Sequence, residues 1–177
     1  PAPFLNRIAD PKYIFKGGNL LDIQMGTDPD ADPDLEEPAP GDIRLLISRR
    51  DGETRAVLYR PEVAGFDGKP VHFESPTGTE DFDSITTTDD VELRELKETE
   101  EGFKVTAVVS RELLGLDELK VGKTLLMDVG YIFGGAGGTD AAARTYWHNN
   151  SFTANVVNDV PNESRLEPNQ WGEVLVE

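Results

Sequence analysis

Hydrophobic and polar residues alternate along most of the chain, which is the pattern of β-strands that bury one face. The clearest example lies at 124–132, where Leu125, Met127, Val129 and Tyr131 occupy every second position. Further strands are predicted at residues 20–26, 42–50, 54–60, 71–74, 81–87, 91–97, 103–110 and 171–176. Many short strands with almost no amphipathic helix predict an all-β fold, an antiparallel β-sandwich of the jelly-roll-like kind.

Glycine, proline and aspartate mark the connections between these strands. Asp51-Gly52 is typical of a two-residue hairpin turn, and the glycines of 134–138 predict a glycine-rich hairpin. Residues 27–41 are rich in proline and acidic side chains, so this segment is expected to be a loop. One short helix is predicted at 110–116, where the Ser110 hydroxyl can cap the first turn.

The chain of 177 residues has the length of one domain. Residues 1–18 are predicted to form an extended N-terminal arm laid over the surface, and residues 19–177 the β-sandwich. The sequence begins PAPFLNRIADP, without a methionine or a basic and apolar leader. We therefore expect a mature or excised piece of a longer protein.

Acidic residues outnumber basic ones, with 34 Asp and Glu against 17 Lys and Arg and a formal net charge of −17. This excess argues against nucleic acid and anionic membranes as partners, because both require clustered cations. It favours cation binding or a neutral ligand. The sequence has no cysteine, which excludes disulfides and thiolate chemistry. No apolar run reaches the length of about 18 residues that membrane insertion needs.

Four aspartates alternate within the acidic loop, at Asp28, Asp30, Asp32 and Asp34. Oxygen ligands at this spacing can converge on Ca²⁺ where the backbone curls round the ion. The spacing is similar to the start of an EF-hand loop, although the glycine and the distal glutamate are missing and prolines interrupt it. The loop is predicted to bind calcium, with a solvated acidic loop as the alternative.

An aromatic tip follows the glycine-rich turn, where Trp147 stands near Arg144 and Asn149. An indole can cover the C–H face of a sugar ring while guanidinium and amide groups bind its hydroxyls. The alternative is a core tryptophan followed by a turn. No catalytic arrangement emerges, because His72 and His148 have no metal-binding spacing and no serine lies in a GxSxG elbow. We therefore expect a binding domain and no enzyme.

The chain contains, in order, LLDIQMGTDPDADP from residue 20, GDIRLLISR from residue 41, LLMDVGYIFGGAGG followed by ARTYWHN, and NDVPNESRLEPNQWG near the end. Together these segments resemble the family-nine carbohydrate-binding modules and the related DOMON-like β-sandwich domains of secreted bacterial proteins. The resemblance runs from about Phe15 to the end of the chain. It implies a secreted protein in an extracellular, periplasmic or cell-surface location.

The resemblance also implies a polysaccharide or oligosaccharide held between two aromatic rings, beside structural Ca²⁺. The sugar-binding residues that it implies here are Trp147, Arg144, Asn149, Asp22, Arg44 and Phe15. Trp147 matches the second aromatic, and Phe15 or Tyr13 is the only counterpart of the first. Arg144 stands where an asparagine is expected, and Gly130 replaces a glutamine on the central strand.

The family's sandwich begins with strands that precede residues 20–26, and here only the arm precedes them. We therefore expect a neighbouring domain or a second chain to complete the sheet edge, because an uncovered edge promotes association.

Two other function classes fit the same fold. DOMON-like domains include haem-binding electron-transfer modules, for which Met25, Met127, His72 or His148 are the candidate axial ligands. Met residues are also common core fillers. The third possibility is a structural or adhesive domain of a surface assembly that binds calcium for stability alone.

Overall fold

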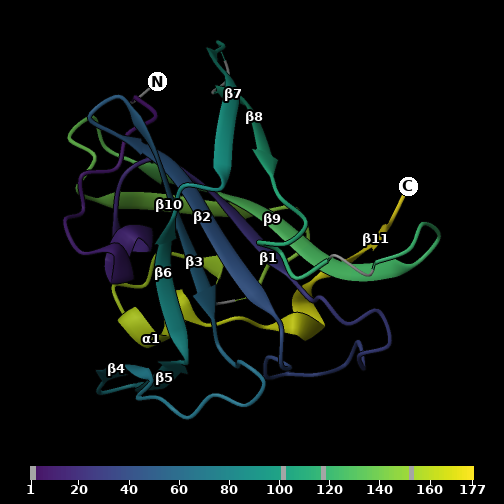
Figure 1. Cartoon of the computed structure of the whole chain (residues 1–177). Coiled ribbons are helices and arrows are strands. Elements are labelled where there is room, and N and C mark those ends of the chain that lie inside the picture. The colour runs from purple at the N-terminus through teal and green to yellow at the C-terminus, as the bar shows by residue number, and fades with distance from the viewer. Residues whose placement is uncertain (1–2, 101–102, 117–118, 152–153) are drawn as a thin grey trace.

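One antiparallel sheet of seven strands forms the centre of the molecule (Figure 1). The computed structural model describes residues 3–100, 103–116, 119–151 and 154–177. The strands follow the spatial order β10 (Ala141–Tyr146), β9 (Thr124–Gly134), β1 (Leu20–Met25), β2 (Ile43–Arg50), β3 (Glu53–Arg60) and β6 (Ser84–Thr88). Strand β11 (Gly172–Leu175) pairs with the first residues of β9, on the same edge as β10.

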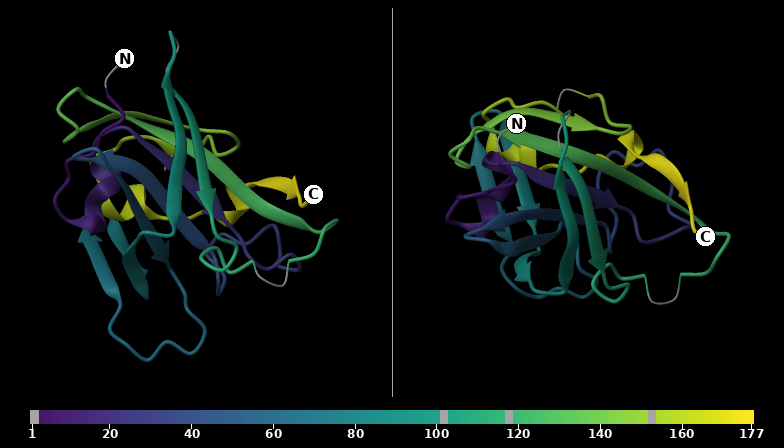
Figure 2. Two further views of the ribbon diagram at one scale, coloured as in Figure 1. Left: turned by 45° about the horizontal axis from the view of Figure 1, so that its top comes forward. Right: turned by 90° about the horizontal axis from the view of Figure 1, so that it is seen from above.

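Two-stranded ribbons cover the two faces of this sheet (Figure 2). Strands β4 (Val71–Ser75) and β5 (Gly78–Phe82) form one ribbon, and β7 (Val91–Glu98) and β8 (Phe103–Val109) form the other. Each ribbon contributes to a different hydrophobic core. The predicted all-β, antiparallel, sandwich-like fold is therefore confirmed.

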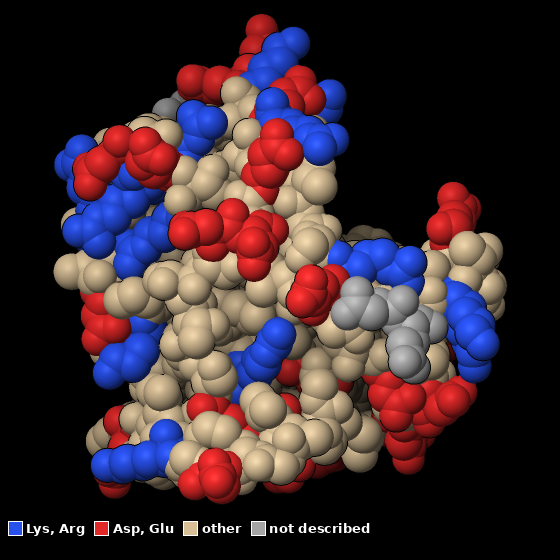
Figure 3. All heavy atoms as spheres, in the orientation of Figure 1, with Lys and Arg blue, Asp and Glu red and all other residues tan. Residues whose placement is uncertain are grey.

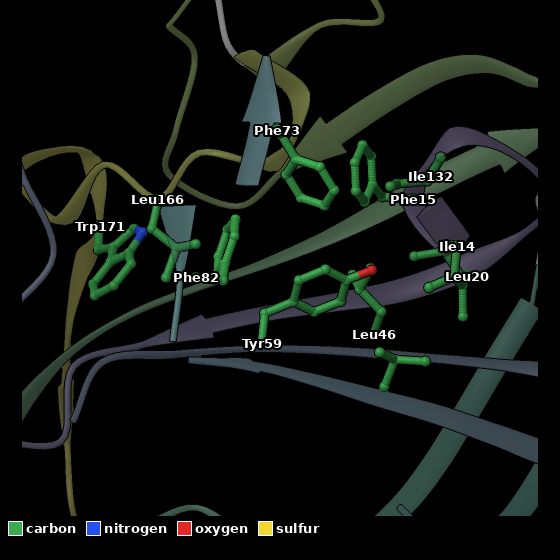
Figure 4. Close-up of a cluster of buried hydrophobic side chains, with 11 residues drawn as sticks. Ile14, Phe15, Leu20, Leu46, Tyr59, Phe73, Phe82, Ile132, Leu166 and Trp171 are labelled. Carbon is green, nitrogen blue, oxygen red and sulfur yellow. The ribbon is translucent and has the colours of Figure 1, made fainter. Parts of the chain in front are cut away.

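The first core lies between the main sheet, the β4–β5 ribbon and the C-terminal segment (Figure 4). Four aromatic rings from different elements meet there edge to face: Phe15, Tyr59, Phe73 and Phe82, with ring centroids 5.6 to 6.2 Å apart. Such contacts add to the free energy gained by burying apolar area. The second core lies under the β7–β8 ribbon and includes Leu45, Leu58 and Val91.

The N-terminal segment is part of the first core, which corrects the expectation of an arm on the surface. Residues Pro11–Lys16 form the 3-10 helix η1, and the Asp10 side chain caps it by accepting a hydrogen bond from the Lys12 N–H. Ile14 and Phe15 of η1 are fully buried. This helix was not predicted from the sequence because it is short and lies among prolines and polar residues.

The predicted strand at 81–87 is two strands. Chain pairing changes at Asp83, between β5 in the small ribbon and β6 at the edge of the main sheet. The Asp83 N–H donates to the Pro61 carbonyl, and its carboxylate accepts from the Val63 N–H at 2.8 Å. These bonds hold the chain where it leaves one sheet for the other.

The helix predicted at 110–116 is a series of turns. The Ser110 hydroxyl accepts the Leu113 N–H at 3.1 Å, as a cap would. Gly115 adopts a φ of +71°, which stops the helix after one turn. A short α-helix forms instead at α1 (Val160–Ser164), in a polar stretch where no helix was predicted. Asp159 caps α1 by accepting the Asn162 N–H.

Other local predictions are confirmed. Residues 27–41 contain no helix or strand, and Asp51 and Gly52 adopt φ values of +53° and +89° in the turn between β2 and β3. The described helices include none that is long and apolar enough to cross a bilayer. The main sheet ends at β6 on one side and at β10 with β11 on the other, so a partner at either edge stays a prediction.

Candidate functional site

A network of charged side chains lies inside the first core. Arg44 on β2 donates two hydrogen bonds to the Asp22 carboxylate on β1, with Nε–Oδ1 at 3.0 Å and Nη2–Oδ2 at 2.6 Å. The Tyr146 hydroxyl at the end of β10 donates a third, to Asp22 Oδ2 at 2.7 Å. Arg44 and Asp22 are fully buried. The carboxylate thus has the several partners that a buried charge requires.

Helix α1 supplies the second half of this network through Glu163. Its carboxylate accepts hydrogen bonds from Arg144 Nη2 at 2.7 Å and from Lys16 Nζ at 2.9 Å. Its main-chain carbonyl accepts from both Arg144 and Arg44. The two guanidinium groups also face the ring of Phe15, at 5.5 and 5.8 Å from its centroid. The network therefore joins the main sheet to η1 and α1.

Burial and neighbouring charges set the protonation of this network. Burial raises the pKa of Tyr146, and the Asp22 carboxylate raises it further, so the phenol remains a donor. Burial lowers the pKa of Arg144. Burial also opposes the charge of Arg44, but the Asp22 carboxylate outweighs it and raises the pKa of Arg44.

Four of the predicted sugar-binding residues therefore do lie together, but inside the protein. Asp22, Arg44, Arg144 and Phe15 are buried and bind protein groups on several sides. This corrects the expectation that they face a ligand. A strand position between apolar residues is ambiguous in sequence, because a charge there can face solvent or pair within the core.

Trp147 lies apart from this network, in the turn that follows β10, and 60% of it is exposed. The Asp128 carboxylate fixes this turn. It is fully buried and accepts the N–H groups of Val129 at 2.8 Å, His148 at 3.0 Å and Asn149 at 2.8 Å. The Trp147 N–H itself donates to the Val129 carbonyl. The indole is thus carried by a rigid main chain.

Glycines allow two close approaches around this turn. A Cβ on Gly130 would lie 2.3 Å from the Tyr146 ring, and a Cβ on Gly172 would lie 2.7 Å from the Trp147 ring. Tyr146 can therefore reach Asp22, and Trp147 can lie against the start of β11. Asn149, also predicted to bind sugar, is buried, and its side-chain oxygen accepts the Ser151 N–H at 2.8 Å.

Sequence reasoning missed Asp128, which holds the turn, and Glu163, which holds the network. A single charged residue in the apolar run of β9 was the available signal for Asp128. Glu163 gave no such signal, because it lies in a polar segment whose helix was not predicted.

A cavity of about 790 Å³ opens elsewhere, between segments that are far apart in sequence. It is lined by residues of 36–38, 61–62, 79–81 and 165–170. Its volume lies within the range of small-molecule sites. Arg165 is one of its lining residues and donates a hydrogen bond to the Glu80 carboxylate at 3.0 Å.

The aspartates of the acidic loop form local turns. Asp28 and Asp32 each accept the N–H of the residue two positions ahead, at 2.9 and 3.0 Å. Asp30 forms an ion pair with Lys123 at 3.3 Å, and Asp34 is exposed. The acidic atoms gather over this loop at the lower right of Figure 3. Within the described ranges no three acidic or histidine side chains are grouped to hold a metal ion, and calcium binding stays a prediction.

The candidate haem ligands occupy three places. Met25 and Met127 face each other across β1 and β9 and pack in the second core. His72 contacts Asp81 on the β4–β5 ribbon at 2.7 Å. His148 Nδ1 lies 2.9 Å from the Gln170 carbonyl. Haem binding remains a prediction from the sequence.

Comparisons of the chain with protein-family models, with curated proteins and with solved structures returned no match. The resemblance to carbohydrate-binding modules therefore remains a prediction.

Proposed function

We propose that this chain is a non-catalytic saccharide-binding domain whose principal contact is Trp147. The observation that carries the proposal is a tryptophan 60% exposed on a turn that Asp128 holds rigid. Burying an indole gains much apolar contact at a low cost in side-chain entropy, because the ring is already in place. Tryptophan is enriched at interfaces, because its ring offers a large apolar face together with an N–H donor.

Polar groups beside the indole suit the hydroxyls of a sugar. Thr145, His148 and Asn150 are exposed in the same stretch of chain. Because a carbonyl can only accept, the contact of His148 Nδ1 with the Gln170 carbonyl requires Nδ1 to donate. The neutral ring then presents Nε2 as an acceptor. These groups replace the buried Asp22 and Arg44 as candidate contacts to the hydroxyls of the sugar.

Isothermal titration with cellohexaose, xylohexaose and a soluble β-glucan tests the proposal. Stacking and a few hydrogen bonds predict saturable binding in the micromolar range or weaker, because each net hydrogen bond contributes only about 1 kcal/mol. Trp147→Ala should weaken binding by about tenfold or more. Phe66→Ala is the matched control, since Phe66 is another exposed aromatic ring, at 38%, and this change should leave binding intact.

Absence of heat with every glycan would contradict the proposal. Equal weakening by both variants would also contradict it. If Trp147→Ala left glycan binding unchanged but altered the elution volume on a sizing column, Trp147 would be a protein contact. That outcome would favour the structural or adhesive class.

A further inference from the structure

The cavity described above has walls that are held in place by hydrogen bonds between separate segments. The Asn169 N–H donates to the Leu35 carbonyl at 2.9 Å and joins the acidic loop to the C-terminal segment. Arg165 joins that segment to β5 through Glu80, whose side chain is 13% exposed. The cavity therefore forms part of the folded chain and does not depend on one loose loop.

Acidic side chains dominate its lining. The carboxylates are Glu36, Glu37, Glu62, Glu80, Asp81 and Glu167, and the one cationic residue in the described lining is Arg165. Arg165 pairs with Glu80, and His72 contacts Asp81, so the carboxylates of the lining outnumber its one described arginine. A cleft lined by one sign of charge concentrates ligands of the opposite sign.

The spacing of these carboxylates indicates which kind of cation the cavity can bind. They come from four segments and are spread over a volume of about 790 Å³. In the described part of the chain no three of them are grouped to hold one metal ion. Separate carboxylates in a polar lining match a ligand that carries several separate positive charges. Asn169, Gln170 and Thr79 add hydrogen-bonding groups between them.

We propose that this cavity binds a small flexible oligoamine, with ammonium groups distributed among the carboxylates. Its volume is that of a small-molecule site. Trp147 does not line this cavity, and the proposal does not depend on the saccharide proposal.

Titration with spermine at low salt, followed by calorimetry, tests this site. We expect one-to-one binding that weakens strongly at about 0.3 M NaCl, since exposed ion pairs are screened. The double variant Glu37→Gln, Glu62→Gln should weaken binding about tenfold, because each exposed pair that is lost costs a few-fold. Both side chains are exposed, so the variant should fold like the parent, and circular dichroism checks this.

The matched control is Asp89→Asn, Asp90→Asn, which makes the same change in net charge at two exposed residues between β6 and β7. It should weaken spermine binding less than the Glu37→Gln, Glu62→Gln variant does, because Asp89 and Asp90 do not line the cavity. Equal weakening by both double variants would mean that net charge alone attracts the amine, and would overturn the site. No saturable binding, or several equivalents of spermine per chain, would overturn it as well. Trp147→Ala should bind spermine normally, so this result and the saccharide test can fail independently.

Discussion

Asp42, at the start of β2, is a carboxyl group that the fold keeps away from water. It is 3% exposed, and its Oδ2 accepts the Ala39 N–H at 2.9 Å. Burial raises the pKa of Asp42 to about 6, and the negative charges of Asp28 and Glu62 act in the same direction. The folded protein therefore binds a proton at this site more tightly than the unfolded chain does.

Asp42 should make the protein more stable as the pH falls from 7 to 4. Below a pH of about 6 the folded state takes up a proton that the unfolded chain takes up only near pH 4, so protonation favours folding. Relative to Asp42→Asn, which does not titrate, the parent should gain about 2 kcal/mol in the free energy of unfolding over this interval. Urea unfolding of both proteins at several pH values measures the difference. A difference that does not change with pH would contradict it.

Residue types alone predicted Trp147, Asp22 and Arg44 as sugar contacts. They did not show that Trp147 is exposed while Asp22 and Arg44 are buried. All three belong to strands or to the turn after a strand, and the alternation of β-structure leaves either face open to a charged residue. Asp22 and Arg44 are buried because α1 and η1 cover the network with Glu163 and Phe15. Neither short helix was predicted, so the burial of the network could not be predicted either.

Between elements, the pair of Arg44 and Asp22 links β2, β1 and α1. Arg44→Met should lower the free energy of unfolding by about 3–5 kcal/mol, because it leaves the Asp22 carboxylate buried without its cation. It also removes the hydrogen bonds that Arg44 donates to the carbonyls of Glu163 and Ser164. Chemical denaturation measures the loss.

Arg94→Met is the control for that prediction. Arg94 pairs with Glu92 on β7 at 3.2 Å, and both side chains are more than half exposed. This change should cost less than about 1 kcal/mol. A similar loss in both variants would show that the buried pair has no special part in joining the elements. A double variant that also replaces Asp22 with Leu should recover part of the loss, because no carboxylate then remains uncompensated.

Strands with regular alternation were predictable, and the positions where the chain changes partners were not. β2 and β3 follow the predicted hairpin through Asp51 and Gly52. The break at Asp83 depends on hydrogen bonds to Pro61 and Val63, which are some twenty residues away in sequence. The local pattern of hydrophobic and polar residues carries no information on such distant contacts. Residues 81–87 were therefore predicted to form one strand.

At the scale of the whole molecule, the net charge of −17 on 177 residues opposes the compact state. Screening by salt should therefore stabilise the fold. We expect the melting temperature to rise by a few degrees between about 0.02 and 0.3 M NaCl, which corresponds to about 1 kcal/mol. Differential scanning calorimetry measures this rise. A fall in melting temperature would contradict it.

Calcium chloride at matched ionic strength tests the metal site predicted from the sequence. Screening alone gives the same stabilisation by either salt, whereas a calcium site adds stability by binding the folded state. The replacement of Asp30 and Asp34 by asparagine should remove any added stability. If added stability survives this replacement, the ion binds elsewhere.

The two tryptophans of the sequence lie in opposite environments. Trp171 is 4% exposed, and its Nε1 donates to Gln24 in the first core, while Trp147 lies against the start of β11 and is 60% exposed. Their fluorescence is therefore separable: an aqueous quencher reaches Trp147 in the folded protein and reaches Trp171 only after unfolding. A ligand that covers Trp147 would protect one emission and leave the other unchanged. The chain thus carries separate internal reporters for site occupancy and for loss of the fold.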